Sequence, residues 1–144
     1  MWREQIAQMS PAVKFFGPAD AADIAIAERS IECAFPDELR LLLLESDGVS
    51  GEYLLPLIWN THRISTDNRM FRSQSSFREL FMPFDHLLFF GDAGNGDQFA
   101  FAIHGGKVRG SDVFVWDHET DSRTCIAPSL VKYLEWWLSG RISL

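Results

Sequence analysis

The groups most able to do chemistry in this 144-residue chain lie in two short polar segments. One is a glycine-rich stretch at residues 91–97, and the other follows an apolar run that ends in tryptophan. Their polar side chains are Asp92, Asn95, Asp97, Asp117, His118, Glu119 and Asp121. Carboxylates beside a histidine are groups that can bind a metal ion or transfer a proton. A metal-assisted hydrolase built on Asp92, Asp97, Asp117 and His118 is therefore one hypothesis for this chain.

The spacing of these groups argues against both a metal site and a phosphate site. Neighbouring side chains of a strand point to opposite faces, so we expect Asp117 and His118 not to converge on one ion. The other histidines are scattered and form no HxxxH or HExxH pattern. The glycine-rich stretch lacks the Gly-Lys-Ser/Thr ending of a phosphate loop, and we expect it to lead into a strand. We therefore predict no metal, no cofactor and no catalytic residue, and a turn that the glycines make possible.

The charge of the chain favours a protein partner over a nucleic acid. The net charge is −7, whereas nucleic-acid binding depends on lysines and arginines that neutralise phosphates. A basic protein partner fits better, because opposite charges speed association. Residues 91–121 hold six acids and two bases, a net of −4, and residues 57–80 hold four arginines and two acids, a net of +2. Ordinary solvated loops would give the same pattern, so both interpretations stay open.

The sequence predicts a cytoplasmic protein that does not contact a membrane. Charged and polar residues occupy the N-terminal segment and no apolar stretch follows, so we expect no secretory signal. Apolar runs such as residues 41–44 are far shorter than the roughly 20 residues of a membrane span. Cys33 and Cys125 are far apart and form no CxxC pattern. We predict two reduced, largely buried thiols.

Apolar patterning and turn residues predict an α+β fold. Helices are predicted at residues 20–30, 58–71 and 129–139, and from residue 35 to a stop at Asp47-Gly48. Strands are predicted at residues 52–57, 87–90, 98–103, 113–116 and 124–126, with polar loops at residues 73–76 and 117–122. This order favours a largely antiparallel sheet of about four to six strands flanked by N-terminal and C-terminal helices. The length fits one domain over residues 1–144.

Three segments, taken in order, resemble the SUKH superfamily. The first is a proline-led helix that ends before Asp47-Gly48, and the second is the strand and glycine-rich turn at residues 88–97. The third is the strand end Val113-Phe114-Val115-Trp116-Asp117-His118-Glu119. The resemblance is clearest over residues 20–138 and weakest between residues 59 and 84. A departure lies at residues 33–35, where Cys-Ala-Phe precedes the proline and the family often has glycine and leucine.

This resemblance implies a non-enzymatic protein-binding domain, namely an immunity protein that neutralises a cognate toxin, often a nuclease. The alternative is a regulatory scaffold of the same fold with a different partner. The acidity of the chain suits a basic toxin domain. The predicted partner-binding residues are Asp92, Asn95, Asp97, Asp117, His118, Glu119, Asp121 and Trp136. Trp136 lies off the apolar stripe of the last helix, so it is either an exposed contact residue or partly buried against the N-terminal arm.

Overall fold

Helices and antiparallel strands build the fold of the computed structural model, which describes residues 1–144. The helices are α1 (Trp2–Met9), α2 (Ala21–Ile31), α3 (Asp37–Glu45), α4 (Thr61–Ser73), α5 (Ser75–Leu80) and α6 (Leu130–Leu138). The strands are β1 (Lys14–Phe15), β2 (Val49–Ser50), β3 (Pro56–Ile58), β4 (Leu87–Asp92), β5 (Gln98–His104), β6 (Lys107–Trp116) and β7 (Arg123–Ala127). A single 3₁₀ turn, Glu52–Leu54, precedes β3.

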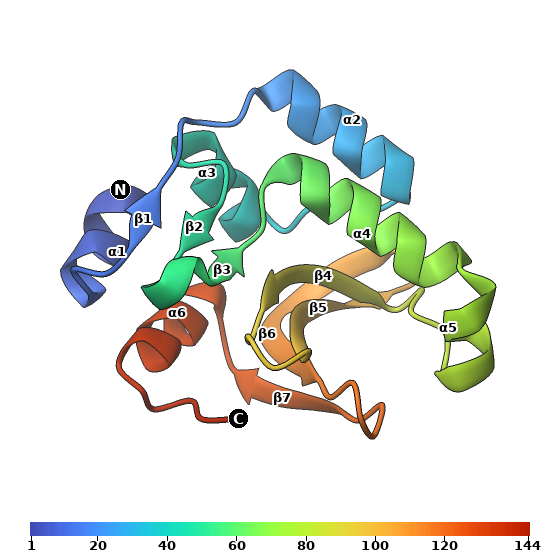
Figure 1. Cartoon of the computed structure of the whole chain (residues 1–144). Helices are drawn as coiled ribbons and strands as arrows, with labels where there is room; N and C mark the ends of the chain where they lie inside the picture. The colour runs from blue at the N-terminus through green and yellow to red at the C-terminus, as the bar shows by residue number, and fades with distance from the viewer.

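The strands form two antiparallel sheets. The smaller has the order β1-β2-β3 and the larger has the order β4-β5-β6-β7, so each strand of the larger sheet pairs with its sequence neighbour. Figure 1 shows the smaller sheet beside α1 and α3, and α2 and α4 together along one side of the molecule. The α+β class, the antiparallel sheet and the helices at both ends are as the sequence predicted.

The two sheets meet where β3 passes close to β4. The Trp59 N–H donates to the Phe90 carbonyl at 2.7 Å, and the buried Tyr133 hydroxyl donates to the Leu57 carbonyl at 2.9 Å. Gly91 is required at this contact, because a Cβ there would lie 2.1 Å from the Leu57 oxygen. These contacts fix the backbone of β3 and the helix α6 beside the glycine-rich turn that follows β4.

The core is one cluster of 32 buried apolar residues drawn from helices and strands alike. It includes the inward faces of α3 and α6 and most of β4 and β5. Phe71 and Trp116 lie in an aromatic group that joins the end of α4 to the end of β6, with ring centroids 5.7 Å apart. Because both β6 and α4 are fixed by this packing, the turn after Trp116 starts from a rigid position.

Four local predictions are wrong. The structure has an additional N-terminal helix, α1, and the segment at 73–76 that was expected to be a loop contains the end of α4 and the start of α5. Residues 52–57 are not one strand, because the 3₁₀ turn occupies their first half. Cys33 is buried, as predicted, but Cys125 is exposed on β7, the outer strand of the larger sheet. The helix predicted at 58–71 is present as α4 and starts three residues later.

None of the helices combines the length and the apolar character that crossing a bilayer requires.

Candidate functional site

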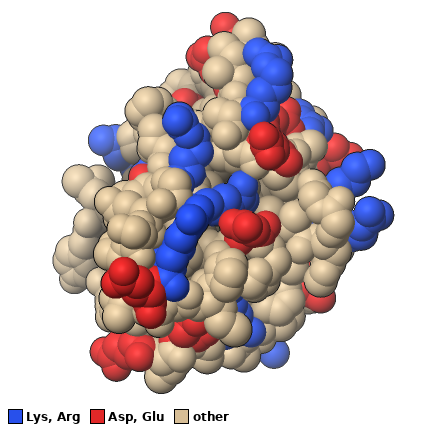
Figure 2. Space-filling model, turned by 90° about the vertical axis from the view of Figure 1, so that its right-hand side faces the viewer, with Lys and Arg blue, Asp and Glu red and all other residues tan.

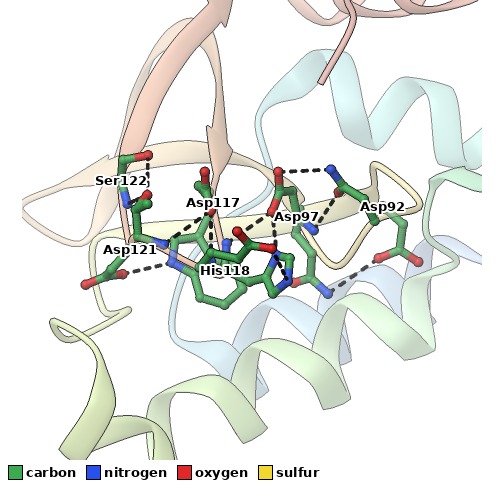
Figure 3. A network of polar contacts seen from close by, with 11 residues as sticks. Asp92, Asp97, Asp117, His118, Asp121 and Ser122 are labelled. Atoms are coloured by element: carbon green, nitrogen blue, oxygen red, sulfur yellow. Dashed lines mark hydrogen bonds and ion pairs between the residues drawn. The ribbon is translucent and has the colours of Figure 1, made fainter.

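The two polar segments come together at one end of the larger sheet. Residues 93–97 connect β4, which ends at Asp92, to β5, and residues 117–122 connect β6 to β7. Because β5 pairs with β6, with Gln98 opposite Trp116, the two turns emerge side by side. Figure 3 shows their acidic side chains in a row, from Asp121 at one end through Asp117, His118 and Asp97 to Asp92 at the other. We call these residues, together with the adjacent Asn95 and Glu119, the acidic row.

Asp97 and His118 form the centre of the acidic row. The His118 ring nitrogen Nδ1 lies 2.6 Å from Asp97 Oδ1, and the His118 backbone N–H donates to the same oxygen at 3.1 Å. Asn95 holds the carboxylate from the other side, donating to Asp97 Oδ2 at 3.3 Å and accepting the Asp97 N–H at 3.0 Å. Hydrogen bonding to Asp97 raises the pKa of His118. The pair therefore favours a protonated imidazole.

The expectation that Asp117 and His118 would point apart is wrong. One potential ligand atom from each of Asp97, Asp117 and His118 lies within 4.8 Å of the others. The strand argument fails because β6 ends at Trp116, so Asp117 and His118 belong to a turn and do not alternate between faces. Asp117 is fixed there, since its Oδ1 accepts the N–H groups of Glu119 and Thr120 at 2.8 and 3.2 Å. Their side chains are near enough to share a small ligand.

Asp92 lies outside that cluster and belongs to an ion pair. Arg63 of α4 reaches its carboxylate with an N–O distance of 2.9 Å and also pairs with Asp67 at 3.0 Å. The Arg63 guanidinium lies over the Trp59 ring, 4.2 Å from the centroid. Gln98 donates to Asp92 at 3.4 Å. The structure therefore separates Asp92 from the other three residues of the hydrolase hypothesis and neutralises its charge.

Asp121 is held by hydrogen bonds from three elements of the fold. Its Oδ1 accepts the Trp116 indole N–H at 2.8 Å and the Arg123 guanidinium at 2.9 Å, and its Oδ2 accepts the Met82 N–H at 2.9 Å. Burial by itself would raise the pKa of Asp121, but these hydrogen bonds outweigh it and the pKa is lowered. Asp121 also adopts a positive φ of 62°. This residue fixes the β6–β7 turn against the segment before β4.

Three acids of the row have no lysine or arginine within ion-pair distance, and of these Asp97 pairs with His118 whereas Glu119 and Asp117 have no strong cationic partner. The Glu119 side chain is 78% exposed, and its nearest charged neighbour is the His118 ring at 4.0 Å. Asp117 is half-buried and bonded to backbone amides only. Negative charge available to an external partner is therefore concentrated at the β6–β7 turn and not spread along the row.

A family model described as SMI1-KNR4 cell-wall (SUKH_6) matches residues 21–134. The chain belongs to the SUKH superfamily. The match runs from the start of α2 into α6 and contains the whole acidic row. Membership of this superfamily supports an immunity or regulatory role through protein binding. SUKH domains are typically non-enzymatic. No curated protein matches this chain.

In this SUKH domain the predicted contact residues do not all lie together. Asn95 and the acidic residues gather in one row, whereas Trp136 lies on α6, which none of the row's hydrogen bonds or ion pairs reaches. Trp136 is partly buried against the core, and the Arg141 guanidinium covers its ring at 4.4 Å. Trp136 also falls two residues beyond the matched range. Its role as a contact residue stays a prediction.

The residues that complete the row were not singled out from sequence. Arg63 was counted only as part of a positive segment, Trp116 was assigned to a strand, and Arg123 was assigned to no element. A weak signal existed for Arg63, which is four residues before Asp67 on one helix face, a spacing at which ion pairs form. No local pattern could connect Arg63 with Asp92, because 29 residues separate them.

Proposed function

We propose that this SUKH domain is a non-enzymatic immunity protein that neutralises a cognate toxin by binding it directly. Family membership over residues 21–134 is the observation that carries this proposal. The partner we favour is a basic toxin domain, in keeping with a net charge of −7. Binding would block the toxin sterically and electrostatically, with no chemical turnover.

The arrangement of charge in the acidic row supports a specific contact region for that partner. Asp92, Asp97 and Asp121 are engaged with Arg63, His118 and Arg123 respectively. Glu119 and Asp117 stay uncompensated on a turn that Asp121 holds in place. Fixed charges lose little conformational freedom on binding, so such a turn suits a partner with exposed lysines or arginines.

Co-purification tests the proposal. The tagged chain, produced in its native cell, is isolated under mild conditions and the bound protein is identified. We expect a basic toxin domain, and we expect added chain to abolish the activity of that domain at a one-to-one ratio. A bound protein with no toxic activity would favour the alternative, a regulatory scaffold of the same fold.

The hydrolase hypothesis predicts a bound metal, and we expect none in stoichiometric amount. His118 Nδ1 and Asp97 Oδ1 are already 2.6 Å apart, and backbone amides occupy Asp117 Oδ1. A metal ion would have to displace these hydrogen bonds with few ligands in return. Elemental analysis of the purified chain measures this directly. About one tightly held zinc or manganese ion per chain would revive an enzymatic function.

A further inference from the structure

Three arginines around α4 and α5 have no acidic partner. Arg69, Arg72 and Arg78 make no ion pair within 4.0 Å, whereas Arg63 and Arg123 each pair with a carboxylate. Figure 2 shows the face that carries the C-terminal ends of α2 and α4, with Lys and Arg side chains in a band across it. Asp and Glu side chains lie beside this band on the same face, and the chain as a whole has a net charge of −7.

Arg72 is the most buried of the three, and the carboxylates of Glu32 and Asp85, which also line the hollows around it, lie beyond ion-pair distance. Its guanidinium donates only to neutral carbonyls, those of Ile31 at 2.7 Å and Leu87 at 3.2 Å, and its Nε is buried without any hydrogen-bond partner. Burial lowers the pKa of Arg72, the direction that a desolvated, unpaired cation shows. A half-buried guanidinium is strongly stabilised by a carboxylate, which it can hold with two hydrogen bonds.

Arg72 lines two hollows that differ in character. One has a volume of about 270 Å³ and is lined mainly by aromatic and apolar side chains, among them Phe77, Phe81 and Met82. The other, of about 570 Å³, lies between α2 and α4 and is polar, with Arg69 and Ser73 in its lining. The apolar side chain of Met82 is 56% exposed, and that of Leu80, at the end of α5, is 72% exposed.

We propose that the two hollows form one groove that binds an acidic peptide segment of a partner protein. An apolar side chain of the peptide would occupy the aromatic hollow, and an adjacent carboxylate would pair with Arg72, with Arg69 and Arg78 beside it. Clusters of arginine recognise acidic motifs in this way, and apolar pockets add specificity for the neighbouring side chain. The proposal does not rest on toxin neutralisation, because it requires an acidic segment and not a basic surface.

A peptide is a better occupant than a nucleic acid. The net charge of −7 repels a polyanion at long range, whereas a short segment with one or two carboxylates is repelled far less. The buried rings of Phe71 and Phe84 form part of the lining of the aromatic hollow, which suits contact with one apolar side chain of a peptide.

A random heptapeptide display library, selected on the immobilised full chain, tests the groove without assuming a sequence. We expect the selected peptides to be enriched at least fivefold in aspartate or glutamate next to leucine, methionine or phenylalanine. The double variant Arg69→Gln/Arg78→Gln should lose this enrichment. Both side chains are exposed, and Arg69 makes no side-chain hydrogen bond, so Arg69→Gln alone serves as a second variant if the double variant folds poorly.

Fluorescence anisotropy with the most enriched peptide gives the quantitative result. We expect at least a tenfold weaker affinity for Arg69→Gln/Arg78→Gln, and for a peptide with its acids replaced by amides. The matched control Lys14→Gln/Lys107→Gln removes the same charge elsewhere and should stay within twofold of the parent chain. Met82→Thr, in the aromatic hollow, should weaken binding without altering its salt dependence.

Several outcomes would overturn the proposal. Selection without acidic enrichment would do so, and so would equal enrichment on the arginine variant or equal weakening by the lysine control. Saturable binding of a 20-residue oligothymidylate that requires Arg69 and Arg78, with no peptide binding, would assign the groove to single-stranded nucleic acid instead.

Discussion

Asp97 and Glu119 lie in the same acidic row, yet their surroundings give them different roles. Asp97 is buried and accepts hydrogen bonds from both the backbone and the ring of His118. Glu119 is 78% exposed and lies 4.0 Å from the same ring. Residue type alone does not separate a carboxylate that stabilises a turn from one that a partner can reach. Burial and hydrogen bonding do.

The pairing of His118 with Asp97 predicts a pH dependence. Hydrogen bonding to Asp97 raises the His118 pKa above its ordinary value of 6.5. A raised folded-state pKa means that the pair stabilises the folded chain below the unfolded value, and that this contribution is lost as pH rises through the folded value. Asp97→Asn should lower the His118 midpoint in an NMR titration. His104 serves as internal control, and an unchanged His118 midpoint would contradict the pairing.

Gly96 is needed for conformation and for space. Its φ is +100°, and a Cβ at this position would lie 2.8 to 3.0 Å from the His118 ring atoms. We expect Gly96→Val to reduce the free energy of unfolding by about 1–3 kcal/mol, measured by urea denaturation. Gly110→Val is the matched control, because Gly110 has no positive φ and open space around its Cα. Normal stability of Gly96→Val with lost partner binding would show instead that the turn is a contact site.

At the scale of elements, one side chain attaches α4 to β4. The buried Asn68 amide donates to the Ile64 carbonyl at 2.7 Å and the Phe89 carbonyl at 2.9 Å, and its oxygen accepts the Phe89 N–H at 2.9 Å. Asn68 thereby makes the backbone hydrogen bonds that a further strand would otherwise make at this edge of β4. The position of α4 in turn sets Arg63 against Asp92.

Asn68→Ala should be strongly destabilising. The substitution leaves the Phe89 N–H and carbonyl buried without their partner, and each such group costs about 1–3 kcal/mol. We expect a loss of about 2–4 kcal/mol in the free energy of unfolding. Thr66→Ala, an exposed position on the same helix, should change it by less than about 0.5 kcal/mol. Similar values for the two variants would refute the role assigned to Asn68.

Elements with strong local signals were predictable, and those fixed by distant contacts were not. The turns at residues 91–97 and 104–107 and the Asp20 cap of α2 follow from local residue types. α1 has no side-chain cap of its own. Instead, Glu45 of α3 accepts the N–H groups of Trp2 and Arg3 at 3.0 and 3.1 Å, which lowers the Glu45 pKa to about 2.

The same distinction holds for the site. The sequence indicated which segments are acidic and that glycines shape the first turn, and their proximity follows from a predicted antiparallel sheet. It could not indicate which acids are neutralised. Asp92 is neutralised by Arg63 of α4, 29 residues away, and Asp121, which pairs with the nearby Arg123, also accepts the Met82 N–H from 39 residues away. The convergence of Asp117 with His118 depended on where β6 ends, which apolar alternation places only approximately.

For the whole molecule, uneven charge predicts the kinetics of association. Asp117→Asn/Glu119→Gln removes the two uncompensated charges of the row, so association with the co-purified partner should slow and depend less on salt. Asp121 is left unchanged, because replacing it would disturb the turn. Glu4→Gln/Asp23→Asn removes the same charge from exposed positions on α1 and α2 and should have a smaller effect. Equal association rates for parent and row variant at low salt would exclude steering by this turn.

The different exposure of the two cysteines allows the opening rate of the fold to be measured by thiol modification. Cys125 is exposed on the outer strand β7, whereas Cys33 is 5% exposed and burial raises its pKa. A disulfide reagent such as dithionitrobenzoate should modify one thiol at once and the second only when the core opens, because attack requires an accessible thiolate. The slow phase would therefore report the opening rate near α2 in the absence of denaturant. Selective labelling of Cys125 would leave Cys33 free to report the opening rate and would place a single dye on the larger sheet.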